Sequence, residues 1–360
     1  MILGLGKAVP LHSISQHEAA RLAQSLCGYS HATSHLLPLL YQRTRVENRG
    51  SVLLDQDLPD AKLVTSFFQT GSDEEDLGPD TEKRMARYAL EAPRLGVQAS
   101  QRALMDAGVS VNAIDHLVTV SCTGFSAPGF DMSLIKELGL KHSVSRTHIG
   151  FMGCHGAFNG LRVASALARE NPGSSVLLCS VELCSIHFAY SAHAEKIVSN
   201  ALFADGASAA ILSAHGHSPG RWRLLTTGST IFPDSEDAMT WKIGNHGFQM
   251  HLSAKVPSLI LEYLPFWLNP WLSAQGVSMS QIRSWAIHPG GPRVLDAVEK
   301  ALGLTPANTK VSREILANHG NMSSATLIFI LERLSQRKAP APCVALGFGP
   351  GLAVEAALLV

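Results

Sequence analysis

Apolar positions along the chain alternate between a helical spacing and short continuous runs. Residues 90–107 show the helical spacing and are followed by Gly108, a residue type that commonly ends helices. Residues 116–121 then form a short apolar run of the kind found in buried strands. The helical pattern returns at 154–168, and a second apolar run at 176–181 follows an Asn-Pro-Gly turn. The first half of the chain is therefore predicted to alternate helices and strands.

The second half repeats this alternation. The apolar run at 284–288 predicts a buried strand, and a proline at its first position marks the start of a helix over 292–302. A further helix is predicted from 321 to about 334, and a strand at 343–347 follows it. Alternating elements of this kind predict an α/β layered fold.

Length and composition indicate a compact enzyme built from two halves. The 360 residues exceed the usual size of a single core, so two fused halves are expected, and the composition of 213–220 suits a connector. Hydrophobic residues make up 46% of the chain and charged residues 16%, with 29 Lys+Arg against 29 Asp+Glu. This balance gives no overall positive field, which weighs against nucleic acid or an acidic membrane surface as a partner.

The sequence contains no pattern that predicts export, membrane insertion or metal binding. Residues 1–7 lack a basic region followed by a long apolar one, and no uncharged apolar span reaches about 18 residues. We therefore expect a cytoplasmic location and no integral membrane segment. The six cysteines form no CxxC pair or metal-like cluster, so free thiols and no bound metal are expected.

Cys154 lies in a turn of small residues at the start of a predicted helix. The unpaired N–H groups and the positive dipole end of a helix favour thiolate over thiol. Gly153 and Gly156 on either side allow a substrate carbonyl to approach closely. Taken alone, a buried cysteine is more often simple packing.

His288 and Asn321 change that interpretation. His288 ends a predicted strand, and Asn321 lies in a glycine turn that leads into an apolar helix. Individually, they suit a hydrogen-bonded core histidine and a turn or N-cap residue. Together with Cys154, they place three reactive side chain types at element junctions, where rigid scaffolds usually present chemistry.

Four motifs resemble the signatures of type III polyketide synthases, the chalcone-synthase-like family of the thiolase superfamily. They are residues 150–159, His-Pro-Gly-Gly-Pro at 288–292, Gly-Asn-Met-Ser-Ser at 320–324 and Gly-Phe-Gly-Pro-Gly at 347–351. The resemblance extends over essentially the whole chain. The related β-ketoacyl-carrier-protein synthases III also have Cys, His and Asn, but with different motifs around His and Asn.

The resemblance implies a thiolase-like αβαβα sandwich of two pseudo-symmetric halves. The division falls in the predicted connector, so we expect an N-terminal half, 1–215, with the nucleophilic cysteine. The C-terminal half, 216–360, then carries the histidine and the asparagine. The family's substrates are an acyl-CoA starter and malonyl-CoA, no further cofactor is implied, and a homodimer is expected.

The chemistry implied for the three residues is carbon–carbon bond formation between thioesters. Cys154 accepts the starter acyl group from coenzyme A, and His288 keeps the thiolate ionised. Malonyl-CoA loses carbon dioxide, and donors from His288 and Asn321 hold the enolate oxygen, each worth on the order of 3 kcal/mol. Repeated extension and cyclisation give a pyrone or a phenolic ring.

Further positions carry over from the family's substrate cavity. Phe203 falls on a gatekeeper phenylalanine between the CoA tunnel and the cavity, and Met250 on a second one, where Met is narrower and more adaptable. The other predicted cavity residues are Cys122, Thr123, Cys184, Ile186, His187 and Trp241. Trp241 stands where plant chalcone synthases have glycine, and it resembles bacterial relatives that make alkylpyrones and alkylresorcinols, so a fatty acyl starter is favoured.

Two other stretches are compared with the family. Arg43, Arg45 and Arg49 form a basic cluster where relatives bind the CoA phosphates, a role that suits arginine, although such clusters are usually solvated surface. Ala127 matches a methionine that plant enzymes insert into the partner subunit's cavity. Its loss leaves dimerisation expected but enlarges the cavity.

Two alternative functions remain open at this point. One is a single-round condensing or acyl-transfer enzyme of the same fold that works on a carrier protein. The other is a catalytically idle partner subunit. The presence of Cys154, His288 and Asn321 argues against the idle subunit, because nothing structural requires that trio.

Overall fold

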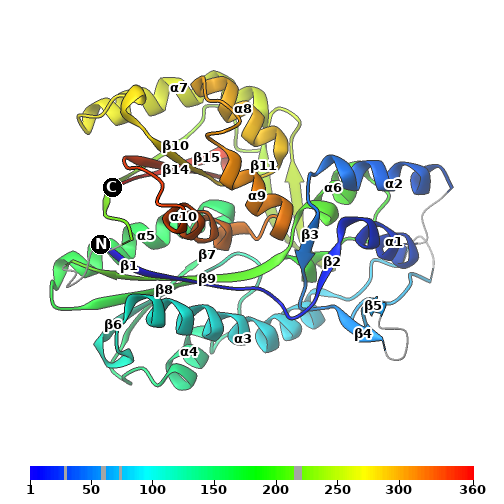
Figure 1. Cartoon of the computed structure of the whole chain (residues 1–360). Helices are drawn as coiled ribbons and strands as arrows, with labels where there is room; N and C mark the ends of the chain where they lie inside the picture. The colour runs from blue at the N-terminus through cyan, green and yellow to red at the C-terminus, as the bar shows by residue number, and fades with distance from the viewer. Residues whose placement is uncertain (28–30, 58–61, 73–74, 215–220) are drawn as a thin grey trace.

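Two β-sheets and three layers of helices make up the fold of the computed structural model (Figure 1), which describes residues 1–27, 31–57, 62–72, 75–214 and 221–360. The first sheet has the strand order β1-β9-β8-β6-β7, and the second has β10-β15-β14-β13. The first contains β1 (Ile2–Ala8), β6 (Ile114–Ser121), β7 (Ser145–Gly150), β8 (Ser175–Leu183) and β9 (Asp205–Ser213). The second contains β10 (Leu224–Ile231), β13 (Ser284–Ile287), β14 (Cys343–Gly349) and β15 (Ala353–Leu359).

Two apolar helices fill the space between the sheets. They are α5 (Gly156–Glu170) and α10 (Thr326–Gln336), and Phe158 and Phe329 from them are fully buried. They share one core cluster with side chains of both sheets. This burial on all sides explains why α10 is apolar around its whole circumference near its start.

The outer faces of the sheets carry the other long helices. Helices α3 (Thr81–Ala107) and α4 (Phe130–Leu138) cover the first sheet, and α7 (Val256–Ala274) and α8 (Pro292–Leu302) cover the second. Helix α9 (Lys310–His319) packs against α10. The five layers therefore confirm the αβαβα sandwich.

The two sheets have matching topology. In the first, β6 runs parallel to β8, while β9 is antiparallel to both β8 and β1. In the second, β13 runs parallel to β14, while β15 is antiparallel to both β14 and β10. The pseudo-symmetry is thus seen strand by strand. Ser213 ends β9, but residues 215–220 of the predicted connector lie outside the described residues, so the division at 215/216 stays a prediction.

Most predicted elements have the expected positions, and α3 shows why one does not. Helix α8 covers 292–302 as predicted. Helix α3 begins at Thr81 instead of residue 90, because the Asp80 carboxylate accepts a hydrogen bond from Lys83 N at 2.8 Å and caps an earlier start. It ends at Gly108, whose φ of 62° is the left-handed conformation that favours glycine.

Short helices and hairpins form a side lobe at one end of the layers (Figure 1). The helices are α1 (Gln16–Cys27), α2 (His31–Arg43) and α6 (Ala194–Leu202). The hairpins pair β2 (Ser13–Ser15) with β3 (Asn48–Gly50), β4 (Asp55–Asp57) with β5 (Lys62–Val64), and β11 (Met239–Gly244) with β12 (Gly247–Leu252). Several of these elements line the pocket described below.

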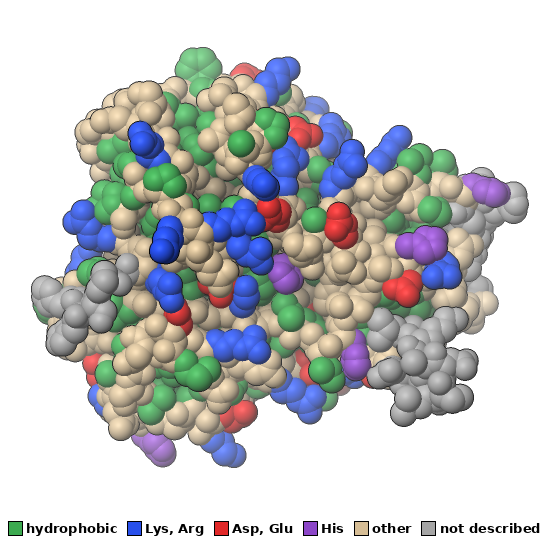
Figure 2. All heavy atoms as spheres, viewed as in Figure 1, with side chains coloured by type: hydrophobic (Ala, Val, Ile, Leu, Met, Phe, Trp, Pro, Cys, Tyr) green, Lys and Arg blue, Asp and Glu red, His purple; other side chains and the backbone are tan. Residues whose placement is uncertain are grey.

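Both signs of charge appear on the face shown in Figure 2, with much uncharged surface between them, as the balanced composition predicts. No helix in the described part of the chain has the length and apolar character needed to cross a membrane. Within the same residues, no group of three or more His, Cys, Asp or Glu is placed to hold a metal ion. None of the six cysteines forms a disulfide with another described residue.

Candidate active site

The three predicted catalytic residues are buried at element junctions. Cys154 lies in the 3-10 turn Gly153–His155 that leads into α5, and 6% of it is exposed. His288 directly follows β13, and Asn321 directly precedes the turn into α10; both are fully buried. Because α5 and α10 are the helices between the sheets, the two halves of the chain present these residues at the centre of the sandwich.

Glycines let the C-terminal motif pack against the cysteine turn. Gly153 has a φ of 67°, and a Cβ there would lie 2.5 Å from Pro350 Cδ. A Cβ on Gly349 would lie 2.2 Å from the His155 ring. Any side chain at either position would displace the turn that carries Cys154. This close approach accounts for Gly349, the central glycine of the Gly-Phe-Gly-Pro-Gly motif.

Asn321 contacts Cys154 directly. Its Nδ2 lies 3.9 Å from the Cys154 Sγ. The Oδ1 accepts a hydrogen bond from Ser323 N at 2.8 Å, which fixes the orientation of the amide. The Asn321 main chain is held as well, because Asn321 N donates to Leu202 O and Ala204 N donates to Asn321 O, both at 2.9 Å. The amide N–H groups of Asn321 are therefore directed toward the thiol side of the pocket.

The His288 ring is buried without a hydrogen-bond partner. Neither ring nitrogen has one among the described residues, while the backbone N–H donates to Leu346 O at 2.8 Å. Burial lowers the pKa of His288 to about 3, and the charge of nearby His155 acts in the same direction. Since buried polar atoms are nearly always paired, an unpaired imidazole is available to a ligand.

Burial also shifts the pKa of the Cys154 thiol. It raises the pKa of Cys154 to about 11, although hydrogen bonding to Ser323 and Asn321 opposes the shift. The free pocket therefore favours a neutral thiol and a neutral imidazole, in contrast to the resting thiolate expected from the helix position. Burial raises the pKa here because Cys154 is almost completely enclosed, and a charged thiolate is poorly solvated in such a site.

A cavity of about 310 Å³ opens onto Cys154. It brings together seven other predicted residues, namely Cys122, Thr123, Cys184, His187, Phe203, Trp241 and Met250. The eighth predicted cavity residue, Ile186, is fully buried beside this lining and is not part of it.

Aromatic rings form a rigid wall of the cavity. The His187 ring stacks on Phe248 with 4.2 Å between centroids and meets Trp241 edge-on at 5.3 Å. His187 Nδ1 accepts a hydrogen bond from Phe248 N at 2.9 Å, so Nε2 carries the proton and donates to Thr123 O at 2.6 Å. Burial lowers the pKa of His187 to about 3. Trp241 Nε1 donates to Cys122 O at 2.7 Å, which fixes the indole.

The opposite end of the cavity is apolar, and a buried arginine shapes it. This apolar end is lined by Ile14, Ala19, Leu22, Ala23, Leu26, Leu53, Leu54, Phe68, Leu77, Phe188 and Tyr190. Arg84, fully buried, donates from Nη1 to Ile186 O at 2.6 Å and to Phe188 O at 2.9 Å, and from Nε to Pro79 O at 2.7 Å. Its guanidinium therefore holds together two segments of the wall. Arg84 was not among the residues predicted from the sequence.

Comparison with known proteins identifies the family. The family described as chalcone and stilbene synthases matches through its N-terminal domain at residues 1–216 and its C-terminal domain at residues 223–360. The chain belongs to the chalcone and stilbene synthase family. This synthase is 32% identical to the "Alpha-pyrone synthesis polyketide synthase-like Pks18" of Mycobacterium tuberculosis, over 99% of this chain and 90% of that protein.

Solved structures agree with this assignment. The synthase superposes on PKS-I from the brown alga Ectocarpus siliculosus with a TM-score of 0.92 and 30% identity, covering 100% of this chain and 97% of that one. It superposes on 1,3,6,8-tetrahydroxynaphthalene synthase of Streptomyces coelicolor with a TM-score of 0.86 and 28% identity, covering 99% and 98%. The protein is therefore a type III polyketide synthase with a thiolase-like fold. It is an acyltransferase-type enzyme of a family that uses CoA thioesters.

A buried carboxylate organises the polar side of the synthase's pocket. Glu182, fully buried in β8, accepts hydrogen bonds from Cys122 N at 3.1 Å, Thr123 Oγ1 at 2.8 Å and Ser324 Oγ. Burial raises its pKa, and these hydrogen bonds oppose the shift. Glu182 thus fixes both pocket residues that follow β6 relative to the turn after Asn321. A single acidic residue in the otherwise apolar run at 175–183 was the signal that could have found it.

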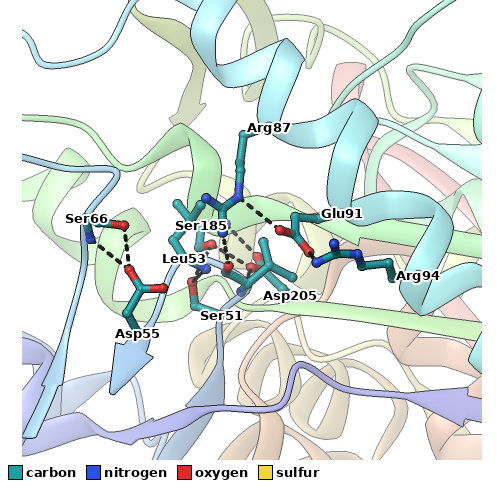
Figure 3. Close-up of polar contacts among 10 residues, drawn as sticks. Ser51, Leu53, Asp55, Ser66, Arg87, Glu91, Arg94, Ser185 and Asp205 are labelled. Carbon is teal, nitrogen blue, oxygen red and sulfur yellow. Dashed lines mark hydrogen bonds and ion pairs between the residues drawn. The ribbon is translucent and has the colours of Figure 1, made fainter. Parts of the chain in front are cut away.

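A second buried carboxylate anchors the loop on another wall (Figure 3). Asp205 accepts from Val52 N at 2.8 Å and from the Ser185 hydroxyl at 2.6 Å, and Ser51 Oγ lies 2.7 Å from Ser185 Oγ. Arg87 on α3 donates to Val52 O at 2.9 Å. Burial raises the pKa of Asp205 to about 6. Ser51 and Ser185 both line the cavity, so these contacts fix its shape.

The three predicted CoA-binding arginines do not gather at one point. Arg49 lines the cavity, and its Nη1 donates to Phe203 O at 3.0 Å and to Asn200 O. Its guanidinium is therefore bound to backbone carbonyls at the end of α6. Arg43 and Arg45 are exposed, and Arg45 lines a separate groove. The structure therefore places Arg49 beside Phe203, the predicted gatekeeper, and the other two on the surface.

Proposed function

We propose that the synthase transfers a fatty acyl group from coenzyme A to Cys154, extends it with malonyl-CoA and cyclises the product. The observation that supports this most strongly is the single cavity that joins Cys154 to the apolar end. An aliphatic chain of the starter gains free energy there at about 25 cal/mol per Å² of buried apolar surface. The fixed Trp241 indole occupies the space on the other side, which directs the chain toward the apolar end.

The neutral states of the Cys154 thiol and the His288 imidazole suit loading by an internal proton transfer. The Cys154 proton moves to His288, the thiolate attacks the thioester carbonyl, and the departing CoA sulfur takes the proton back. No net charge enters the buried site at any stage, so its desolvation does not block the reaction. The acyl group is then held as a Cys154 thioester.

His288 and Asn321 then act on the extender. The malonyl thioester loses its carboxylate as carbon dioxide, and the electrons of the broken bond form an enolate whose oxygen accepts hydrogen bonds from His288 and Asn321. The enolate carbon attacks the Cys154 thioester carbonyl and expels the Cys154 thiolate, leaving a chain two carbons longer on CoA. The unpaired His288 ring and the fixed Asn321 amide support these roles.

The product class that we propose is a pyrone or a resorcinol, with the pyrone favoured. The printed name of the mycobacterial relative assigns it to alpha-pyrone synthesis, and that protein matches 99% of this chain. Arg43 and Arg45 are proposed to contact the CoA phosphates, and a cytoplasmic location suits these substrates.

A homodimer is proposed from the exposed edge of the first sheet. Strand β7 is the outermost strand of that sheet, and its side chains are largely exposed. The large apolar side chains of Phe125, Met132 and Phe151 are exposed near it. Unpaired edges with apolar surface favour pairing with a second copy. Sedimentation of the purified protein tests this directly, and a monomer at micromolar concentration contradicts it.

The function is tested by mass spectrometry of the products made from malonyl-CoA and a panel of acyl-CoA starters. The panel runs from acetyl-CoA to long fatty acyl-CoAs and includes aromatic acyl-CoAs. Triketide or tetraketide pyrones or resorcinols from the fatty starters are expected. Extension of aromatic starters alone would contradict the fatty starter, and extension only of a carrier-protein-bound starter would contradict the CoA-dependent reaction.

A further inference from the structure

Polar side chains from α6 and β12, together with Met250, line part of the cavity apart from the side chains of its apolar end. This α6–β12 rim consists of Lys196, Ser199, Gln249 and Met250, all of which line the cavity. Gln249 is exposed, so the rim faces solvent. The division separates surface suited to an acyl chain from surface suited to a charged or polar group.

Lys196 places a cation on the rim. It shares one face of α6 with Asn200, because residues four positions apart lie on the same side of a helix. Its Nζ donates to Met250 O at 3.0 Å, which ties α6 to β12. An ammonium group carries three N–H donors, so two remain for another partner.

Within the described residues, no carboxylate lies within 4.0 Å of the Lys196 ammonium. The adjacent Glu195 is exposed and lies 3.2 Å from the His251 ring instead. Glu195 is also the one charged group whose field acts appreciably on Lys196. Lys196 is half-buried, and a partly desolvated cation interacts more strongly with an anion than one in bulk water.

The other cation of the cavity has a different environment. The Arg49 Nη1 donates to two backbone carbonyls at the end of α6, and the Arg49 guanidinium lies 5.7 Å from the centre of the Tyr41 ring. With the part of the chain that the structure describes, Lys196 makes a single hydrogen bond, which a neutral donor could also make. Its positive charge is therefore not explained by its structural contact.

We propose that Lys196 binds an anionic oxygen of the incoming CoA thioester at the α6–β12 rim. The oxygen belongs either to the malonyl carboxylate or to a phosphate of CoA, and both present the same chemistry to an ammonium group. The inference rests on the proposed function, since it takes CoA thioesters as the molecules that reach Cys154 through this cavity.

The test compares four thioesters with variants at one position. Malonyl-CoA carries both anions, malonyl-N-acetylcysteamine carries the carboxylate alone, octanoyl-CoA carries the phosphates alone, and octanoyl-N-acetylcysteamine carries neither. Lys196→Gln removes the charge and keeps a donor for Met250 O, while Lys196→Arg keeps the charge. Lys242→Gln, an exposed position on β11 outside the cavity lining, is the matched control.

Lys196→Gln is expected to raise KM by about three- to tenfold for the thioesters that carry the recognised anion, with kcat little changed. An increase for both malonyl thioesters alone assigns the carboxylate, and an increase for both CoA thioesters alone assigns the phosphate. Lys196→Arg should restore KM, and Lys242→Gln should leave it unchanged. Unchanged KM for every thioester, or an equal increase for octanoyl-N-acetylcysteamine, would overturn the proposal.

A binding measurement separates this inference from the proposed function. Protection of Cys154 against iodoacetamide by free CoA or by malonyl-N-acetylcysteamine reports occupancy of the cavity without turnover. If the wild-type protein extends no starter, weaker protection in Lys196→Gln than in Lys242→Gln still supports the anion contact. Equal protection in the two variants by both compounds contradicts it.

Discussion

The proposed catalytic centre and the apolar end of the cavity differ in how their buried polar groups are paired. At the proposed catalytic centre, both His288 ring nitrogens are buried without a hydrogen-bond partner among the described residues. At the apolar end, Arg84 is equally buried, but its guanidinium donates to the carbonyls of Pro79, Ile186 and Phe188. A group left unpaired is available to substrate, whereas a fully paired one fixes the wall. For these two residues, hydrogen-bond pairing and not burial is what differs between the proposed chemical role and the structural one.

The largest expected effect is the loss of activity in Cys154→Ala. Removing the nucleophile prevents formation of the acyl thioester, so condensation should fall by about a thousandfold or more. Product formation from malonyl-CoA and a fatty acyl-CoA measures this. Cys122→Ala and Cys184→Ala, which change two other buried thiols of the same cavity, are the matched controls. Equal losses in all three variants would contradict a unique nucleophile.

Variants of His288 and Asn321 should impair a different step of the reaction from variants of Cys154. His288→Ala and Asn321→Ala each remove a proposed donor to the enolate, so decarboxylation of malonyl-CoA should fall by about 10²- to 10³-fold. Cys154→Ala should retain more of this decarboxylation than either variant. Release of carbon dioxide without a starter measures it. Undiminished decarboxylation in both donor variants would contradict the proposed roles of His288 and Asn321 as donors to the enolate.

Arg84→Met tests the scaffold side. The variant leaves at least three buried carbonyls without their donor, which should lower the free energy of unfolding by about 3 kcal/mol or more. Urea unfolding measures this loss. Because Arg84 touches the wall and not the thiol, Cys154 should still alkylate at the wild-type rate below the unfolding midpoint, while selectivity among starter lengths weakens. Wild-type stability, or unchanged length selectivity in a destabilised protein, would contradict this role.

Trp241→Ala should change which starters the cavity accepts. It removes the indole that donates to Cys122 O and packs against His187, and so opens space beside the catalytic centre. The ratio of kcat/KM for benzoyl-CoA to that for octanoyl-CoA should rise about tenfold, in line with the size selectivity of apolar pockets. Trp241→Phe keeps most of the volume and should change the ratio little. The same ratio in all three proteins would show that the indole does not limit the starter.

The same contrast explains what could be predicted from the sequence. Cys154, His288 and Asn321 stand in short glycine-rich turns at the ends of strongly patterned elements. The alternation of those elements predicted an α/β layered fold, and the resemblance to the family implied the αβαβα sandwich. The apolar end is assembled from β2, α1 and loops that are distant in sequence, so no local pattern marks it. The role of Arg84 could not be predicted from the sequence. It depends on the carbonyls of Pro79, Ile186 and Phe188, which only the tertiary structure brings together.

Charge state was the other quantity that the sequence could not provide. Proximity to a helix start predicted a Cys154 thiolate, but burial opposes that charge and raises the pKa of the thiol. Enclosure depends on the whole surrounding structure, whereas the helix start is local. The three arginines show the same limit, because only the fold separates Arg49 from Arg43 and Arg45.

The smallest expected effect is a change in the pH dependence of stability. Burial lowers the pKa of His187 to about 3, against about 6.5 in the unfolded chain. Between these values the unfolded chain binds a proton that the folded protein does not. The stability contributed by this group is therefore complete above pH 6.5 and is lost as the pH falls toward 3. His288 acts in the same direction, and Asp205, whose pKa is raised to about 6, acts in the opposite one between about pH 4 and 6.

His187→Gln isolates the contribution of this one ring. A glutamine side chain can accept from Phe248 N and donate to Thr123 O as the imidazole does, but it does not titrate. Between pH 7 and pH 5 the variant should lose about 2 kcal/mol less unfolding free energy than the wild-type protein. Urea unfolding at the two pH values measures the difference, and the shared contributions of His288 and Asp205 cancel in it. Equal losses of unfolding free energy in the two proteins would mean that His187 is protonated in the folded protein. That result would contradict a neutral His187 ring in the aromatic wall.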